Sequence, residues 1–225
     1  MSTSSLSKFL PRERIGILGG TFNPIHNGHL VMAEEVSRYH DLSKIFFIPT
    51  YIPPHKNADS LANARHRYQM VKEAIKENEK FSVSDIEIRR KGKSYTIDTI
   101  QEILGSDAPS TQTGVDSGDC EVFLILGSDS LHELVLWKSI KRLSELCYFV
   151  IVNRPGYPTK IPEKLADLIG RDRALTIEKL QVEIAPVEIS STDIRQKLKK
   201  GASIHDLVPP CVERYIRENG LYVPH

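Results

Sequence analysis

Short apolar runs recur along the chain, and each is followed by a longer segment in which apolar residues are spaced three or four positions apart. The continuous runs lie at 14–18, 44–49, 121–126 and 147–152, each ending at or just before a glycine, proline or asparagine. Runs of this kind are typical of strands that are buried on both faces. Shorter strand patterns occur at 81–84, 86–88 and near 180–184.

The segments between these runs have helical spacing. We expect helices over 30–39, 64–75, from about 94 to 100, over 131–143 around Trp137, near 161–169, over 190–199 and over 212–218. For the helix near 94, both Ser94 and Thr96 are candidate N-caps, and no clean capping box is present. The patterns around 65–67 predict a basic, solvated helix face rather than a phosphate site.

Strands that alternate with helices indicate a parallel sheet covered on both faces. We therefore predict an α/β fold with a Rossmann-like, doubly wound parallel sheet, in a single domain over 14–225 with a small C-terminal helical part. Residues 1–13 are expected to be a disordered lead-in. The polar stretch 106–119 has hardly an apolar side chain and is predicted to be a loop or insertion, with an interdomain linker as the alternative.

The composition narrows the class of protein. The chain has 225 residues and a formal net charge of +1, from 30 Lys and Arg against 29 Asp and Glu. That balance argues against a protein that coats nucleic acid. The three cysteines are widely spaced without a C-x-x-C pair, so neither a zinc site nor a disulfide framework is expected. The start of the chain lacks an apolar signal-peptide region and no run is long enough to span a membrane, so we expect a soluble, cytoplasmic protein.

The polar clusters share a position relative to the predicted strands. They follow strand ends at 19–29, 51–56, 127–129, 153–157 and 189–195. In parallel sheets, ligands bind beyond the carboxyl ends of the strands. We therefore expect these clusters to converge on one rim of the sheet.

The stretch Gly19-Gly20-Thr21-Phe22-Asn23-Pro24-Ile25-His26-Asn27-Gly28-His29-Leu30 joins the first strand to the first helix. Glycines let the backbone approach an anion, and the N–H groups that begin a helix face it. The stretch is neither a Walker loop nor the dinucleotide G-x-G-x-x-G fingerprint. A second cluster, Ser190-Ser191-Thr192-Asp193-Ile194-Arg195, places three hydroxyls and an arginine at another helix start, a set that suits phosphate oxygens.

These motifs carry a resemblance. The stretch from Gly19 to His29 resembles the signature of the nucleotidyltransferase superfamily with the H-x-G-H motif. Together with 51–56, Ser94-Tyr95-Thr96-Ile97-Asp98-Thr99, Trp137 and 190–195, in the same order, it resembles the bacterial nicotinate mononucleotide adenylyltransferases over about 14–222. The resemblance implies transfer of AMP from ATP to nicotinate mononucleotide, giving deamido-NAD and pyrophosphate in NAD biosynthesis.

The resemblance also implies roles for individual residues. It makes His26, His29 and Arg195 the catalytic residues, with the two histidines on the ATP phosphates and Arg195, Ser191 and Thr192 on the departing pyrophosphate. The implied ATP-binding residues are Gly19, Gly20, Thr21, Phe22, Gly28, Gly127, Asp129 on a ribose hydroxyl, Arg154 near the adenine, Ser190, Ser191 and Thr192. The implied nicotinate mononucleotide-binding residues are His55, Lys56, Tyr95 and Thr96 through their backbone, and Trp137 stacked on the pyridine ring.

The implied reaction needs no general base, because a phosphate monoester with a second pKa of about 6 is already largely dianionic at neutral pH. In-line positioning and charge neutralisation are then the tasks of the protein. Mg²⁺ is the implied cofactor, bound through the ATP phosphates with no metal ligand from the protein. The expected partners are the small molecules ATP and nicotinate mononucleotide, without nucleic acid or membrane, and a homo-oligomer stays open.

Asn23 departs from the family pattern, which usually has aspartate at this position. Asparagine keeps the capping acceptor and removes a negative charge near the phosphates, so the resemblance still implies activity. The related eukaryotic enzymes have asparagine there and accept nicotinamide mononucleotide as well, so the preference for nicotinate stays open. The stretch 51–56 and the pair Tyr95-Thr96 favour the acid-preferring type. A carboxamide would point its own N–H₂ at backbone donors.

Simpler interpretations compete with these roles. Trp137 suits a core position, Lys56 a solvated loop, Arg154 a turn and Asp129 a helix cap. Among functions, phosphopantetheine adenylyltransferase is the alternative within the superfamily, although it usually has threonine where His26 stands. A nucleotide-binding regulator without catalysis is the alternative from another class, and a nucleic-acid-binding module fits the charge balance least.

Overall fold

The structure is a computed structural model that describes residues 12–52, 61–105, 120–153 and 160–223. Its strands are β1 (Glu13–Gly20), β2 (Lys44–Pro49), β3 (Phe81–Val83), β4 (Cys120–Gly127), β5 (Tyr148–Asn153) and β6 (Val182–Glu183). Its α-helices are α1 (Asn27–Tyr39), α2 (Ala64–Ile75), α3 (Ile86–Arg90), α4 (Thr96–Leu104), α5 (Ile140–Leu146), α6 (Glu163–Ile169), α7 (Arg171–Lys179), α8 (Ser191–Lys199) and α9 (Pro210–Glu218). Two short 3-10 helices, η4 (Ser128–Ser130) and η5 (Glu133–Leu136), follow β4.

The six strands form one parallel sheet in the order β3-β2-β1-β4-β5-β6. The chain first builds outward from β1 to β3, then returns to the other side of β1 to build β4, β5 and β6. The direction of winding therefore reverses between β1 and β4. This confirms the predicted Rossmann-like parallel sheet, and such a reversal is where α/β sheets of this kind bind ligands.

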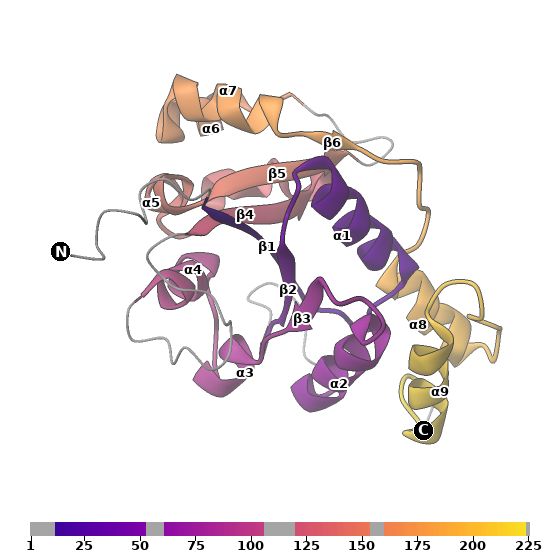
Figure 1. Cartoon of the computed structure of the whole chain (residues 1–225). Helices are drawn as coiled ribbons and strands as arrows, with labels where there is room; N and C mark the ends of the chain where they lie inside the picture. Colours follow the sequence, from indigo (N-terminus) through magenta and orange to yellow (C-terminus); the bar gives the residue numbers. More distant parts are fainter. Residues whose placement is uncertain (1–11, 53–60, 106–119, 154–159, 224–225) are drawn as a thin grey trace.

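Helices cover both faces of the sheet (Figure 1). Alternate strand residues divide between two cores: Ile15, Ile17 and Leu124 pack with α3 to α7, while Phe47 and Ile125 pack with α1, α2, α8 and α9. The apolar runs that were continuous in sequence thus supply side chains to two separate cores. Burial on both faces explains why these strands show no polar alternation.

Three local expectations were wrong, and one helix was missed. The segment 131–143 is not a helix around Trp137, because Trp137 has an extended backbone between η5 and α5. The alternating segment 86–88 belongs to helix α3, in which Arg89 Nε pairs with Asp85 Oδ1 one turn earlier at 2.9 Å. The N-cap of α4 is Tyr95, with neither Ser94 nor Thr96 in that position. Helix α7 was not predicted, although Ala174 and Ile177 form a buried face on it. Short periodic segments are ambiguous between strand and helix, and tertiary packing decides them.

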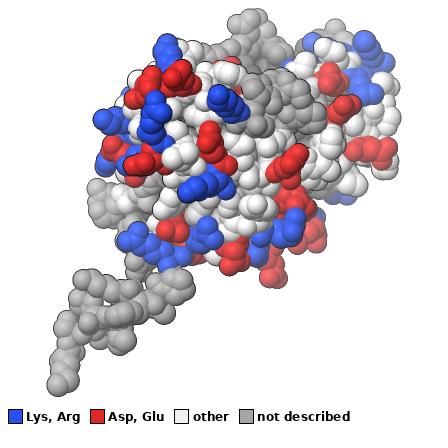
Figure 2. Space-filling view, turned by 90° about the horizontal axis from the view of Figure 1, so that it is seen from above, with Lys and Arg blue, Asp and Glu red and all other residues white. Residues whose placement is uncertain are grey.

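The C-terminal helices α8 and α9 lie together beside α2 and below α1 (Figure 1). Strand β1 begins at Glu13, one residue before the expected start. The predictions for residues 1–11, for the loop 106–119, and for His55, Lys56 and Arg154 lie outside the described residues. None of the helices in the described ranges combines the length and the apolar character needed to cross a lipid bilayer. On the face seen in Figure 2, Lys and Arg side chains lie among Asp and Glu side chains.

Candidate active site

A cavity of about 650 Å³ lies beyond the carboxyl ends of β1 and β4, at the reversal of the winding. Loops after both strands and the start of α8 form its walls. The residues that line it are Leu18, Gly19, Gly20, Thr21, Phe22, Asn23, His26, His29, Met32, Leu61, Ile125, Leu126, Gly127, Asp129, Ser130, Ile189, Ser190, Ser191, Thr192 and Arg195. Three of the five predicted polar clusters therefore meet in one cavity.

Most predicted ATP-side residues line this cavity, with Gly28 on a smaller cavity that shares His26, Met32 and Ile189 with it. Tyr95, Thr96 and Trp137 do not line it. The apolar lining residues, such as Met32 and Ile125, were missed because a sequence pattern assigns them to the core. Ser130 was also missed, because a serine after a strand is common at the start of a helix and carries no specific signal for a binding site.

Two glycines leave room where a side chain would intrude. A Cβ on Gly19 would meet no atom within 4 Å, so its backbone faces open space at the cavity wall. A Cβ on Gly28 would lie 3.1 Å from His26 Nδ1 and 3.3 Å from Val187 Cγ1. Gly19 therefore lets a ligand approach the backbone, and Gly28 lets the His26 ring lie over the first turn of α1.

The two histidines form a stacked pair at the start of α1. Their ring centroids lie 3.7 Å apart with an interplanar angle of 28°. The backbone N–H of His26 donates to Nδ1 of His29 at 3.3 Å, and the N–H of His29 donates to the His26 carbonyl at 2.9 Å. Because Nδ1 of His29 accepts a hydrogen bond, the neutral ring carries its proton on Nε2, which is therefore the donor atom of this ring.

The start of α8 is joined to the loop after β1. Ser190 is the N-cap of α8, and its hydroxyl accepts from the Asp193 N–H at 3.1 Å. Ser191 Oγ donates to the Pro24 carbonyl at 2.9 Å, and Arg195 Nη1 donates to the Asn23 carbonyl at 2.9 Å. These contacts hold the N-terminus of α8 against the glycine loop, residues 19–28 at and after the end of β1. The backbone N–H groups of this loop and of the first turn of α8 therefore face one cavity.

Arg67 contradicts the prediction of a solvated basic helix face. Its side chain is fully buried, and its guanidinium donates to the carbonyls of Ala62, Thr21 and Tyr51 at 2.9, 2.7 and 2.9 Å. Helical spacing carried a signal for this, because Arg67 lies three residues after Ala64 and three before Met70, on the buried face of α2, whereas Arg65 is exposed. Arg67 therefore ties the loops after β1 and β2 together.

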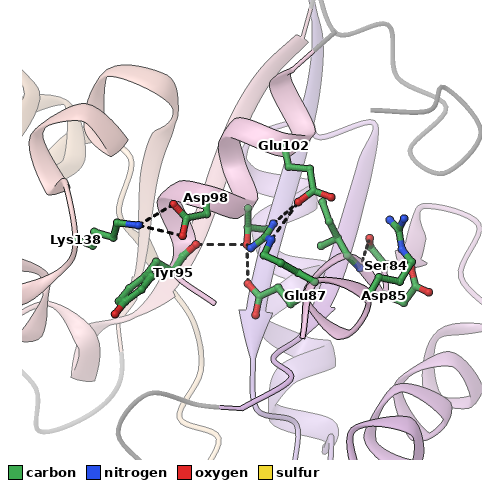
Figure 3. Close-up of polar contacts among 11 residues, drawn as sticks. Ser84, Asp85, Glu87, Tyr95, Asp98, Glu102 and Lys138 are labelled. Atoms are coloured by element: carbon green, nitrogen blue, oxygen red, sulfur yellow. Dashed lines mark hydrogen bonds and ion pairs between the residues drawn. The ribbon is translucent and has the colours of Figure 1, made fainter. Parts of the chain in front are cut away.

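A second group of polar contacts surrounds the start of α4 (Figure 3). Lys138 Nζ lies 3.1 Å from Asp98 Oδ1 and 4.6 Å from the centroid of the Tyr95 ring. Lys138 follows Trp137, which is half-buried against the core. A bridge between Ile52 and Lys93 brings the segment after β2 to the segment before α4. These contacts place Tyr95 and Thr96, which the resemblance assigns to nicotinate mononucleotide, near the segment that carries Trp137. The cavity described above does not include these three residues.

Behind the same turn, Thr99 Oγ1 donates to Glu87 Oε1 at 2.8 Å, and Arg90 Nη1 donates to Thr99 Oγ1 at 3.1 Å (Figure 3). Arg90 also pairs with Glu102. Burial raises the pKa of Glu87, against the opposing effects of the Thr99 hydrogen bond and the Arg90 charge. This network joins α3 to α4 and fixes the helix whose first turn carries Tyr95.

The donor set of the cavity suits a polyanion better than a metal ion. Within the described ranges, no three His, Cys, Asp or Glu side chains are grouped so that they could hold a metal. The described lining residues include Arg195, the two histidines and a single carboxylate, Asp129.

Comparisons with known proteins agree with this geometry. The family model described as Cytidylyltransferase-like matches residues 17–197. A protein of Desulfitobacterium hafniense, named "Probable nicotinate-nucleotide adenylyltransferase", is 38% identical over 213 residues, which cover 94% of this chain and 97% of that protein. A protein of Clostridium acetobutylicum with the same name is 40% identical over 211 residues, which cover 94% of this chain and 100% of that protein.

Solved structures show the same fold. The nicotinic acid mononucleotide adenylyltransferase of Plasmodium falciparum complexed with NaAD matches with a TM-score of 0.67 at 21% identity, over 93% of this chain and 97% of that one. The same enzyme complexed with APC matches with a TM-score of 0.66.

Proposed function

The chain belongs to the cytidylyltransferase-like family and, within it, to the nicotinate-nucleotide adenylyltransferases, and we propose that it transfers AMP from ATP to nicotinate mononucleotide. The products are deamido-NAD and pyrophosphate, a step of NAD biosynthesis. The observation that carries the proposal is the cavity in which the glycine loop, the histidine pair and the start of α8 meet. That set of donors suits the phosphates of ATP.

In the proposed reaction a phosphate oxygen of the mononucleotide attacks the α-phosphorus of ATP. One P–O bond forms, the bond to the β-phosphate oxygen breaks, and pyrophosphate leaves with the electron pair. His26 and His29 stabilise the charge that develops at the α-phosphate, with the Nε2 proton of His29 as one donor. Arg195, Ser191 and Thr192 hold the departing pyrophosphate. Hydrogen bonds to charged groups of this kind contribute about 1.5–3 kcal/mol each.

In this proposal, ATP and nicotinate mononucleotide are bound by different sets of residues. Gly19, Gly20, Thr21, Phe22, Gly28, Gly127, Asp129 and Ser190 complete the ATP side. Tyr95 and Thr96 offer the first N–H groups of α4 to the nicotinate carboxylate, and Trp137 stacks on the pyridine ring. His55, Lys56 and Arg154 keep their proposed roles on the mononucleotide phosphate and the adenine.

We assign Mg²⁺ to the ATP phosphates rather than to a protein cage. The support is the donor set, since the described residues offer no group of carboxylates and histidines for a metal. When bound, the ion supplies charge neutralisation on the phosphates. The residues of the chain then orient the two substrates and exclude water.

The experiment is pyrophosphate release from magnesium-ATP, run in parallel with nicotinate mononucleotide, nicotinamide mononucleotide and phosphopantetheine. We expect fast release with nicotinate mononucleotide alone. Comparable rates with both pyridine substrates would contradict the acid preference assigned to Tyr95 and Thr96. Release with phosphopantetheine only would establish the alternative adenylyltransferase. ATP binding without release in any arm would favour a regulator.

A further inference from the structure

Arg67 is a buried cation with an unusual set of partners. Each arm of its guanidinium donates to a backbone carbonyl, and the three carbonyls belong to the loop after β1, the segment after β2 and the segment before α2. No carboxylate of the described residues forms an ion pair with it. Burial lowers the pKa of Arg67 to about 10, so the side chain is still charged at neutral pH.

A buried charge without a counter-charge is costly, because carbonyl dipoles replace only part of the hydration that is lost. A polar neighbour or a ligand must therefore supply the rest. Thr21, whose carbonyl accepts from Arg67 at 2.7 Å, lines the large cavity. Arg67 thus lies directly behind the wall of that cavity.

A second cation, Arg195, contacts the same loop two residues after Thr21. Arg195 Nη1 donates to the Asn23 carbonyl, and Tyr222 Oη donates to Asn23 Oδ1 at 2.7 Å. The charges of both Arg67 and Arg195 lower the pKa of the Tyr222 phenol, against the larger raising effect of burial. The phenol therefore lies within the field of both guanidinium groups, beside Asn23.

Asn23 is the neutral group in this arrangement. It is 5% exposed, lines the cavity, and its Oδ1 accepts from both the Ala62 N–H at 3.1 Å and the Tyr222 hydroxyl. An aspartate could accept the same two hydrogen bonds with nearly the same shape. The asparagine therefore fills the acceptor position without cancelling the positive charge of Arg67 and Arg195.

We propose that Arg67 is a positioning residue that also supplies charge to the site, and that Arg67, Arg195 and the neutral Asn23 form a net-positive floor for the pyrophosphate group. Tyr222 holds this floor from the C-terminal segment. The inference rests on the proposed function, because it assigns the anion of that reaction to this floor. It adds Arg67, Asn23 and Tyr222, which touch no substrate in the proposed roles above.

The test is the Asn23→Asp variant, which adds a negative charge and keeps an oxygen that can accept the two hydrogen bonds from Ala62 and Tyr222. Affinity for inorganic pyrophosphate with MgCl₂ is measured by calorimetry, and stability by thermal unfolding. We expect pyrophosphate to bind about tenfold more weakly, because the variant adds a negative charge to a residue that lines the anion's cavity. The unfolding midpoint should not fall, because the buried Arg67 gains a counter-charge.

Asn78→Asp is the matched control, since Asn78 Oδ1 also accepts a backbone N–H, from Lys80 at 3.0 Å, away from the cavity. We expect its pyrophosphate affinity to equal that of the parent protein. Equal weakening in both variants would overturn the floor, as would an unchanged affinity of Asn23→Asp. Weaker binding together with a lower unfolding midpoint would assign Asn23 a structural role and also overturn it.

Two variants of Arg67 separate charge from packing. Arg67→Lys keeps the charge without the planar fork, and Arg67→Met removes the charge. We expect Arg67→Lys to keep more of the pyrophosphate affinity than Arg67→Met, and equal affinities in folded samples would overturn the charge role. These measurements use no mononucleotide, so they stand whichever acceptor the release assay identifies. A parent protein that does not bind pyrophosphate would overturn the floor, whereas the release assay alone decides the proposed function.

Discussion

At the scale of single residues, the cavity depends on side chains whose backbone contacts fix their orientation. His29 is the clearest case, because its Nδ1 accepts from the His26 N–H and its ring stacks on that of His26. Phe22 packs edge-on against the same ring at 5.1 Å between centroids. The ring of His29 is therefore held from three sides, and a ligand would meet a donor that is already oriented. Such preorganisation is what charge stabilisation in a transition state requires.

We predict that His29→Ala loses turnover far more than it loses binding of nicotinate mononucleotide. Removing a donor to the developing charge should lower kcat by about 100-fold or more. The measurement is steady-state pyrophosphate release, with binding of the mononucleotide followed by calorimetry. His29→Asn is the companion variant, because its side chain can still accept from the His26 N–H. A His29→Ala enzyme with near-normal kcat would contradict the role of His29 in the reaction, and the exposed His205→Ala serves as the control.

At the scale of elements, two helix starts and two strand ends bring the donors together. Helix α1 follows β1 and helix α8 packs its first turn on the same loop, through Ser191 and Arg195. Helix α4 approaches from the other face of the sheet, where α3 and α5 hold it. Lys138, at the end of the connection after β4, joins the turn that bears Trp137 to the start of α4. Each motif was recognisable in the sequence, but this link between them was not.

We predict that Lys138→Met raises KM for nicotinate mononucleotide and leaves KM for ATP unchanged. The Lys138–Asp98 pair is partly exposed, so its loss should cost at most about 1 kcal/mol, which corresponds to about fivefold in KM. The measurement is the pair of KM values from pyrophosphate release. Arg142→Met is the matched control, because Arg142 pairs with Glu145 on the surface of α5 in a similar geometry. Equal changes in both KM values would mean that Lys138 does not act on the pyridine side.

At the scale of the whole molecule, contacts between distant parts of the chain close the fold around the cavity. Tyr222 reaches Asn23 from the C-terminal segment, and Arg67 joins the loops after two strands. His40, at the end of α1, donates through Nε2 to the Leu180 carbonyl at 3.0 Å, just before β6. Burial lowers the pKa of His40, aided by the Arg14 charge and opposed by the Leu180 contact. The free energy of unfolding should therefore depend on pH in the range where His40 titrates.

We predict that the free energy of unfolding falls as the pH is lowered through the ordinary histidine pKa of about 6.5. The folded protein binds the His40 proton less readily than the unfolded chain does, so acid favours the unfolded chain. In His40→Gln, which can still donate to Leu180, the fall should be shallower. Denaturant unfolding at several pH values between about 5 and 8 gives the slopes. If the free energy of unfolding changed equally steeply with pH in both proteins, His40 would not be the cause of the pH dependence. The variant His132→Gln, at an exposed histidine, is the control.

Local sequence was sufficient for much of this protein. Continuous apolar runs predicted four of the six strands clearly, because strands buried on both faces need apolar residues at every position. The glycine loop with His26 and His29, and the hydroxyl cluster before α8, were recognisable because phosphate binding needs those residue types close together in sequence. The reversal of winding was not visible, yet the rule that ligands bind at strand ends still located the cavity.

The tertiary structure decided what depends on contacts between segments far apart in sequence. Segment 86–88 became helix α3, because the packing of Ile86 and the Asp85–Arg89 pair outweigh a two-residue alternation. Arg67 was assigned to the same solvated face as its exposed neighbour Arg65, but three carbonyls from separate segments surround it. Asn23 and Tyr222 lie 199 positions apart and meet at 2.7 Å. A sequence pattern records which side chains an element offers, and only the packed chain determines which of them share a buried, low-dielectric environment.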